Sequence, residues 1–198
     1  MANNSLVPVE VNHQSVLLCA NDDSHRSAKD GLIWTSSPIM CLSEATQNSY
    51  DAIILYIKGS SLVKAASMIE LCSILKKNRH TCDYPVLAVC FYVNRQIIER
   101  LKEADVDFVV VKKDLEKIDP ESKPAFLMNY VKEENRPARV LDRLCPYIHY
   151  APINDDKELI TCKAYANWLV LGPRRLQELC ETPCYSNCPY YQSPKLPK

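Results

Sequence analysis

Four short, almost continuously apolar runs constrain the fold of this chain more than any other feature. They lie at residues 15–20, 51–57, 85–92 and 107–112, and β-branched side chains recur in them. Runs of this kind are typical of strands that a parallel sheet buries on both faces. A weaker apolar run at residues 38–42 predicts a fifth strand.

Segments with helical periodicity lie between these runs. In residues 60–78 and 94–104, apolar side chains recur every three or four positions behind residues that can cap a helix. Residues 120–133 predict a further helix, with a proline at its start. Strands that alternate with helices predict an α/β fold, here a flavodoxin-like doubly wound parallel sheet.

Ten cysteines are distributed unevenly along the chain. Five are spread over the first 144 residues, namely Cys19, Cys41, Cys72, Cys82 and Cys90. The other five lie close together near the end, namely Cys145, Cys162, Cys180, Cys184 and Cys188. This change in composition is the strongest sign of a domain boundary in the sequence.

A charged segment that contains a proline separates the two groups of cysteines. Its sequence, KEENRPARVLDR at residues 132–143, has the composition of a linker. We therefore expect an α/β domain over residues 1–133, a linker over residues 134–144 and a small cysteine-rich module over residues 145–198.

The overall composition argues against several classes of protein. Basic and acidic residues balance at 24 each, so there is no global positive field for nucleic acid. The first residues lack the pattern of a signal peptide, and no apolar run approaches the roughly 18 residues of a membrane span. We expect a cytoplasmic protein. In that reducing compartment, the cysteines are predicted as core residues, metal ligands or redox groups rather than disulfides.

The late cysteines have the chemistry of metal ligands. Thiolates suit zinc or an iron–sulfur cluster, and four of them can enclose one ion or one cubane. Cys145 and Cys188 each precede a proline, as in ferredoxin-type sequences. The absence of a C-x2-C pair weakens the zinc-ribbon interpretation. The expected ligands are Cys145, Cys162, Cys180 and Cys188, with Cys184 as an alternate ligand or a redox partner.

The size of the module supports a metal as well. A module of about 50 residues buries little apolar surface and usually needs a staple such as a metal ion or a cluster. We expect an iron–sulfur cluster, for which four ligands suit the 4Fe–4S form, or a zinc ion. Reduced cysteines without any metal are the third interpretation.

Four stretches of sequence resemble the response-regulator receiver family, and together they cover about residues 13–133. VLLCANDD resembles the first strand and its acidic pair, YDAIILYIKG the third strand, PVLAVCF the fourth strand, and EADVDFVVVKKD the approach to the fifth strand. The resemblance implies a phosphorelay fold in which an aspartate accepts a phosphoryl group. The acidic pair then binds Mg²⁺, and a hydroxyl residue and a lysine contact the phosphoryl oxygens.

The sequence departs from the receiver pattern where the chemistry occurs. Tyr56 stands at the acceptor position and offers no carboxylate for an acyl phosphate. Cys90 stands at the hydroxyl position, and Lys112 at the position of the lysine. Asp22 and Asp23 correspond to the acidic pair, but we favour a solvated turn or a helix cap there over a Mg²⁺ site. The short spacing from this pair to Tyr56 predicts a truncated first helix or second strand.

These observations lead to a non-enzymatic, non-phosphorylated regulatory protein. We expect a pseudo-receiver that acts in signalling through a protein partner, without contact to a membrane. The cysteine-rich tail resembles extensions found on regulators of anaerobic bacteria, which implies a bacterial sensor or a structural staple. One alternative is a redox or metal-dependent enzyme, although the sequence has no glycine-rich phosphate loop. The other is a DNA-binding regulator that uses Arg174 and Arg175, and nucleic acid is not the favoured partner.

Overall fold

The computed structural model describes the chain in five stretches, which are residues 15–20, 32–115, 124–154, 157–165 and 168–195. The predictions for Asp22 and Asp23 fall outside the described residues, and so do residues 120–123, the first part of the helix predicted over residues 120–133. No helix among the described residues is long and apolar enough to cross a membrane.

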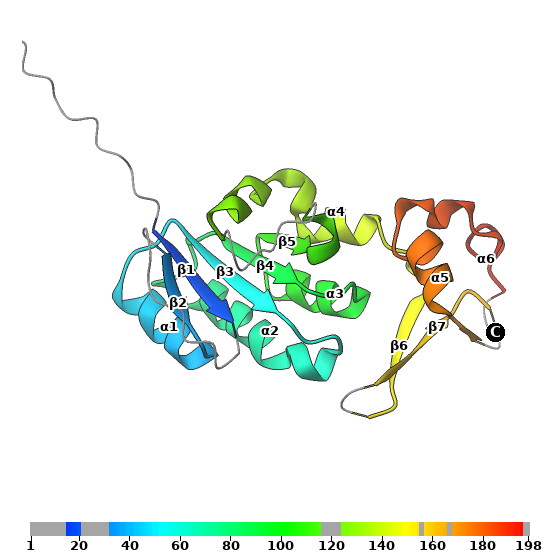
Figure 1. Ribbon diagram of the computed structural model, residues 1–198, viewed down its shortest axis with the longest axis horizontal. Helices are drawn as coiled ribbons and strands as arrows, with labels where there is room; N and C mark the ends of the chain where they lie inside the picture. Colours follow the sequence, from blue (N-terminus) through cyan, green and yellow to red (C-terminus); the bar gives the residue numbers. More distant parts are fainter. Residues whose placement is uncertain (1–14, 21–31, 116–123, 155–156, 166–167, 196–198) are drawn as a thin grey trace, which may run out of the picture.

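Five parallel strands form the main sheet (Figure 1). They are β1 (Val16–Ala20), β2 (Leu32–Thr35), β3 (Ala52–Ile57), β4 (Val86–Cys90) and β5 (Phe108–Val111). Their order is β2-β1-β3-β4-β5, and every neighbouring pair is parallel. This is the strand order of the flavodoxin-like doubly wound fold, so the predicted fold class is confirmed.

Three capped helices connect the strands. They are α1 (Pro38–Gln47), α2 (Leu62–Lys77) and α3 (Arg95–Glu103). The side chains of Ser37, Ser61 and Asn94 each accept a hydrogen bond from a backbone N–H in the first turn of the helix that follows. Such caps satisfy N–H groups that the helix itself leaves unpaired.

The prediction of a strand at residues 38–42 is wrong, because α1 begins there. Ser37 caps the helix and Pro38 occupies its first turn, where the fixed φ of proline suits a helix and its missing N–H costs nothing. Cys41 and Ala45, one helical turn apart, are the buried residues of α1. A run of five apolar residues is too short for its periodicity to distinguish a strand from a helix. The second strand is instead β2.

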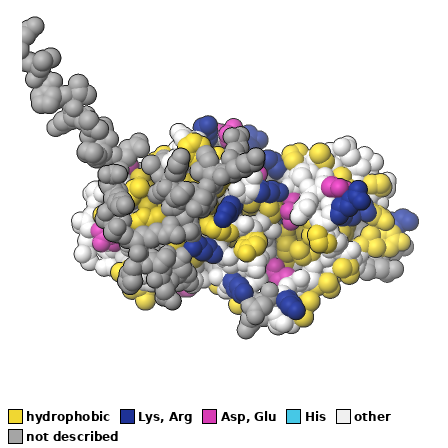
Figure 2. Space-filling model, in the orientation of Figure 1, with side chains coloured by type: hydrophobic (Ala, Val, Ile, Leu, Met, Phe, Trp, Pro, Cys, Tyr) yellow, Lys and Arg dark blue, Asp and Glu magenta, His cyan; other side chains and the backbone are white. Residues whose placement is uncertain are grey.

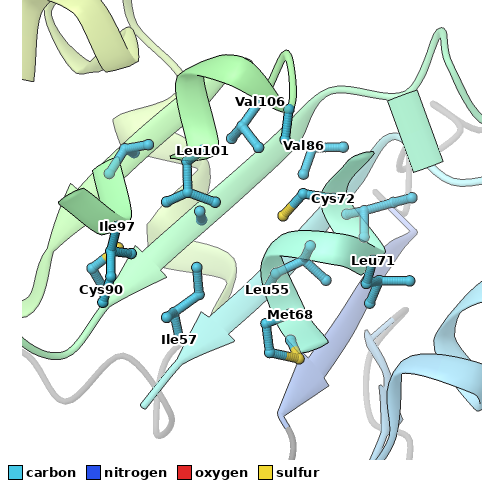
Figure 3. Close-up of a cluster of buried hydrophobic side chains, with 14 of the residues drawn as sticks. Leu55, Ile57, Met68, Leu71, Cys72, Val86, Cys90, Ile97, Leu101 and Val106 are labelled. Carbon is cyan, nitrogen blue, oxygen red and sulfur yellow. The ribbon is translucent and has the colours of Figure 1, made fainter. Parts of the chain in front are cut away.

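Each face of the sheet has its own core. Alternate residues of β3 enter different clusters: Leu55 and Ile57 pack with α2 and α3 on one face, and Ile54 and Tyr56 pack on the other. Figure 3 shows the first cluster, with side chains from β3, β4, α2 and α3 in contact. The second face is covered in part by the 3-10 helix η2 (Pro124–Tyr130), where a longer helix was predicted over residues 120–133.

The charged segment after the sheet is ordered and packed. It contains η3 (Glu133–Asn135) and the short helix α4 (Pro137–Asp142). Val140, Leu141 and Leu144 are buried in the same cluster as α2 and α3. The segment predicted as a linker therefore contributes apolar residues to the core. We call residues 15–144 the sheet domain.

The remaining described residues, 145–195, form what we call the cysteine module. Its antiparallel sheet has the order β6-β7-β8, with β6 (Ile148–Pro152), β7 (Glu158–Cys162) and β8 (Leu169–Val170). Four short helical turns follow, namely α5 (Pro173–Arg175), the π-helical turn η4 (Leu176–Cys180), η5 (Pro183–Asn187) and α6 (Pro189–Gln192). Figure 2 shows hydrophobic side chains over much of the visible surface of this module.

Candidate functional site

Four of the five late cysteines are gathered in the interior of the cysteine module. Cys145 precedes β6, Cys162 ends β7, Cys180 ends η4 and Cys188 caps α6. All four are buried, and the thiol of Cys180 interacts electrostatically with those of the other three. The fifth, Cys184, is exposed in η5. The structure thus brings together the four residues predicted as ligands and leaves the alternate ligand outside.

Backbone pairing holds the elements that carry these thiols. The N–H of Cys145 donates to the carbonyl oxygen of Cys180 at 2.8 Å. Cys162 lies opposite Ile148 in the β6–β7 pair, and the N–H of Lys163 donates to the carbonyl oxygen of Tyr147 at 2.8 Å. Residues far apart in the sequence are therefore fixed beside one another by main-chain hydrogen bonds, independently of side-chain rotation.

Three of the four sulfurs share one local backbone motif. Each interacts with the backbone of the residue two positions later, namely Tyr147 for Cys145, Ala164 for Cys162 and Tyr190 for Cys188. In each case the interaction lowers the pKa of the thiol, which means that the donor favours the thiolate. Hydrogen bonds of this kind orient metal ligands and spread the charge of a thiolate.

The thiols of the site differ in their acidity. Burial raises the pKa of Cys145 and of Cys162, and it raises the pKa of Cys180 to about 12, with the neighbouring thiols adding to the effect. Burial also opposes ionisation of Cys188, but the Arg175 guanidinium and two backbone donors outweigh it and lower the pKa of that thiol. Several thiolates can share this small interior only with a compensating cation, because unpaired buried charges are strongly unfavourable.

The four sulfurs are neighbours without surrounding a single point. Among the residues that the structure describes, no group of three His, Cys, Asp or Glu side chains is placed to hold one metal ion. Binding of a single ion would therefore require the thiols to move closer together. A polynuclear cluster needs less convergence, because its cysteines bind different iron atoms.

The early cysteines lie in a different environment. Cys19, Cys41, Cys72 and Cys90 belong to the apolar cluster between the sheet and α1–α3, and all four are buried (Figure 3 labels Cys72 and Cys90). Burial raises the pKa of Cys72, and it raises that of Cys90 to about 12. These residues pack as small hydrophobic side chains.

The residues that the sequence resemblance assigns to a site at the carboxyl edge of the sheet are only partly brought together. Tyr56 is fully buried, stacked on Trp34 with ring centroids 5.7 Å apart and in edge contact with Phe91 at 6.0 Å. The exposed Lys112 places its Nζ 4.5 Å from the centre of the Phe91 ring. Cys90 enters the cluster on the opposite face of the sheet from Tyr56. Aromatic rings thus occupy the surroundings of the acceptor position.

Arg95 connects this edge of the sheet domain to the cysteine module. It begins α3, and its Nη1 donates to the carbonyl oxygens of Leu141 and Leu144 at 3.1 and 2.8 Å. Its backbone N–H donates to the Tyr150 hydroxyl at 3.2 Å. Leu144 immediately precedes Cys145, so the guanidinium is one residue away from a thiol of the site.

A carboxylate from the module completes the contact. Glu158 accepts hydrogen bonds from the backbone N–H of Leu62 at 3.4 Å and from Asn94 Nδ2 at 3.1 Å. It thereby binds the beginnings of both α2 and α3, where helix dipoles favour a negative charge. Burial is the largest effect on its acidity and raises its pKa. Lys113 Nζ adds a bond to the carbonyl oxygen of Glu181 at 3.0 Å.

Sequence reasoning missed Arg95 and Glu158. Each is a charged residue in an ordinary surface pattern, and nothing local indicates a partner 46 to 96 positions away. The pair Arg174 and Arg175 also differs from expectation. Arg174 pairs with Glu178 at 2.9 Å, and Arg175 contacts Cys188. The two residues do not form the shared basic face on which the DNA-binding alternative depended.

No protein-family model matches this sequence, and no curated protein does. Among solved structures, the chemotaxis response regulator CheY4 of Vibrio cholerae is similar, with a TM-score of 0.45 and 15% identity over 59% of this chain and 98% of that one. The response regulator DrrB of Thermotoga maritima, an OmpR/PhoB homologue, has a TM-score of 0.41 and 13% identity over 80% of this chain and 63% of that one. The fold assignment rests on the strand order of the sheet itself.

Proposed function

We propose that this chain is a regulatory protein in which a metal-binding cysteine module controls a receiver-like domain that has no phosphoacceptor aspartate. Cys145, Cys162, Cys180 and Cys188 hold the metal, and the sheet domain binds a protein partner. The observation that carries the proposal is the gathering of these four buried thiols, three of them beside a backbone group that favours the thiolate.

The composition of the module core supports a metal. Cys145, Cys162 and Cys180 belong to a small buried cluster, with tyrosines packed around it. A core of this size contributes little stability, and cysteine-rich modules commonly gain their folding free energy from the metal. A metal therefore supplies what the apolar surface of the module cannot.

An iron–sulfur cluster is the favoured occupant, and zinc is the second candidate. Both are consistent with four cysteine ligands. A proline follows Cys145 and Cys188, as in ferredoxin-type sequences, and this favours the cluster. The surrounding tyrosines, including Tyr147, Tyr185 and Tyr191, restrict access of water to such a cluster.

Regulation by protein contact is the role that suits the sheet domain. Tyr56 replaces the carboxylate of a receiver and is packed among aromatic rings, so the domain keeps the fold without the acceptor. Arg95 supplies a physical connection, because it bridges the start of α3 and the residue before Cys145. A change of the metal site that moves Cys145 changes this bridge, and with it the α3 edge of the sheet domain.

A metal-dependent enzyme is the alternative. The exposed Cys184 beside a metal site is the feature that favours it. Substrate turnover that requires Cys184 would establish this alternative.

The test is purification of the full chain without oxygen, followed by measurement of iron, acid-labile sulfide and zinc per chain. We expect iron and sulfide in nearly equal amounts, together with a broad visible absorption. Cys188→Ser should lose most of the metal, whereas Cys184→Ser, the matched control in the same segment, should keep it. A wild-type protein free of iron and of zinc contradicts the proposal, and zinc without iron selects the second candidate.

A further inference from the structure

A change of helix type separates Arg175 from Cys180. At the start of the segment, the N–H of Leu176 donates to the carbonyl oxygen of Gly172, four residues earlier. At its end, the N–H of Glu181 donates to the carbonyl oxygen of Leu176 at 2.8 Å, five residues earlier. Residues 176–180 therefore form a π-helical turn, which is rare and occurs frequently at functional sites.

The wider turn alters which residues share a side of the helix. In an α-helix, residues five positions apart are about 140° apart around the axis. In a π-helical turn, five positions make a little more than one turn, so Arg175 and Cys180 come to the same side. Cys180 is buried in the module core, and Arg175 is half-buried.

Arg175 also contacts the site directly. Its Nη2 lies 3.5 Å from the Sγ of Cys188. Its guanidinium lies over the ring of Tyr190, 5.0 Å from the centroid, which fixes the orientation of the guanidinium. One side chain thus contacts Cys188 directly and shares a side of the π-helical turn with Cys180.

The preceding residue provides an internal comparison. Arg174 belongs to the same turn and has the same chemistry, but its side chain is 88% exposed and pairs with Glu178 on the surface. The sequence places two arginines side by side, and the fold directs only one of them to the cysteines.

We infer that Arg175 is a positioning residue of the metal site, held by the π-helical turn so that its guanidinium compensates the charge of the bound thiolates and retains the metal. The inference rests on the proposed function. A bound metal group neutralises the charge of four buried thiolates only in part, and a nearby cation reduces the cost of the remaining charge. Partners that contact a ligand in this way typically contribute about 10- to 100-fold to metal affinity.

The experiment measures how fast the purified, metal-loaded full chain releases its iron or zinc to excess EDTA without oxygen. Arg175→Gln should release the metal about tenfold faster than the wild type or more. Arg175→Lys keeps the charge and should be intermediate, and Arg174→Gln should stay within about twofold. Arg175→Met keeps much of the packing on Tyr190 and should resemble Arg175→Gln, which separates charge from packing.

A second readout separates metal retention from stability. The rise in Tm that the metal produces should shrink in Arg175→Gln, while the Tm of the metal-free chain changes little. Equal release rates for Arg175→Gln and Arg174→Gln in a wild type that binds metal overturn the inference alone. So does a fall in Tm that is equal with and without metal. A wild type without metal overturns the proposed function and this inference with it.

Discussion

Cysteine has two different roles in the two regions of this molecule. In the sheet domain, Cys72 and Cys90 lie among aliphatic side chains from the strands and helices, and burial is the largest influence on their pKa, as it is for Cys162 and Cys188. In the cysteine module, Cys162 and Cys188 lie beside backbone donors, other thiols and the Arg175 guanidinium. The comparison teaches that the surroundings of a thiol, rather than its burial, distinguish a packing residue from a candidate ligand.

Among these variants, Cys162→Ser should produce the largest difference in stability between the cysteine module and the sheet domain. We expect loss of the metal and unfolding of the cysteine module, because the metal supplies on the order of 10 kcal/mol to structural sites of this type. Hydrogen exchange should show lost protection in β6 and β7 and retained protection in β3 and β4. Cys72→Ser is the matched control in the sheet domain and should keep the metal; metal loss there would break the comparison.

Tyr56→Ala should destabilise the sheet domain and leave the metal content unchanged, which is the opposite of the result expected for Cys162→Ser. The ring is fully buried between Trp34 and Phe91, and truncation of a large buried aromatic residue costs about 3–5 kcal/mol. Chemical denaturation should show this loss for the sheet domain, and metal content per folded chain should be unchanged. Stability close to that of the wild type would contradict the packing described for this position.

Arg95→Met tests how strongly Arg95 holds the segment of the sheet domain that leads into the cysteine module. The variant loses charged hydrogen bonds to the carbonyl oxygens of Leu141 and Leu144, which we expect to cost about 2 kcal/mol. Calorimetry should show a lower Tm for the variant than for the wild type. Arg100→Met is a control on the exposed side of α3, where the arginine pairs only with Glu103 in the described structure. An unchanged Tm in both variants would mean that these hydrogen bonds of Arg95 do not stabilise the sheet domain.

Glu158→Gln should have the smallest effect, and that effect should depend on pH. Burial raises the pKa of Glu158, so its protonated form is favoured by folding. Its contribution to stability is present below the ordinary pKa of glutamate and is lost as the pH rises through the raised value. The stability of the variant relative to the wild type should therefore improve from about pH 4 to pH 7. Denaturation midpoints across this range provide the measurement, and the reverse trend would contradict the assignment.

The sheet could be predicted well, because its strands are buried on both faces and its helices are capped. The runs around Leu55 and Val89, and the caps Ser61 and Asn94, are local signals that tertiary structure reinforces. Residues 38–42 and the segment around Val140 were less predictable. In these short segments, the surface onto which the few apolar residues pack determines the secondary structure, and the local sequence does not reveal that surface.

The burial of four late cysteines in one interior could be anticipated from the sequence, whereas their surroundings could not, and their role as metal ligands stays a prediction. The spacing of the late cysteines and the prolines after two of them indicated the four residues that the fold gathers. Arg175 and Glu158 had no such signal, because a π-helical turn and a contact between distant residues leave no periodic pattern in sequence. Their roles depend on geometry that only the folded chain defines.

X-ray absorption spectroscopy at the edge of the bound metal tests the central claim most directly. For wild-type protein prepared without oxygen, we predict a first shell of sulfur ligands at roughly 2.3 Å, with an additional iron–iron shell if a cluster is present. In Cys188→Ser, the sulfur shell should be depleted, and in Cys184→Ser it should be unchanged. A first shell of nitrogen and oxygen in the wild type would contradict the claim that these four thiols hold the metal.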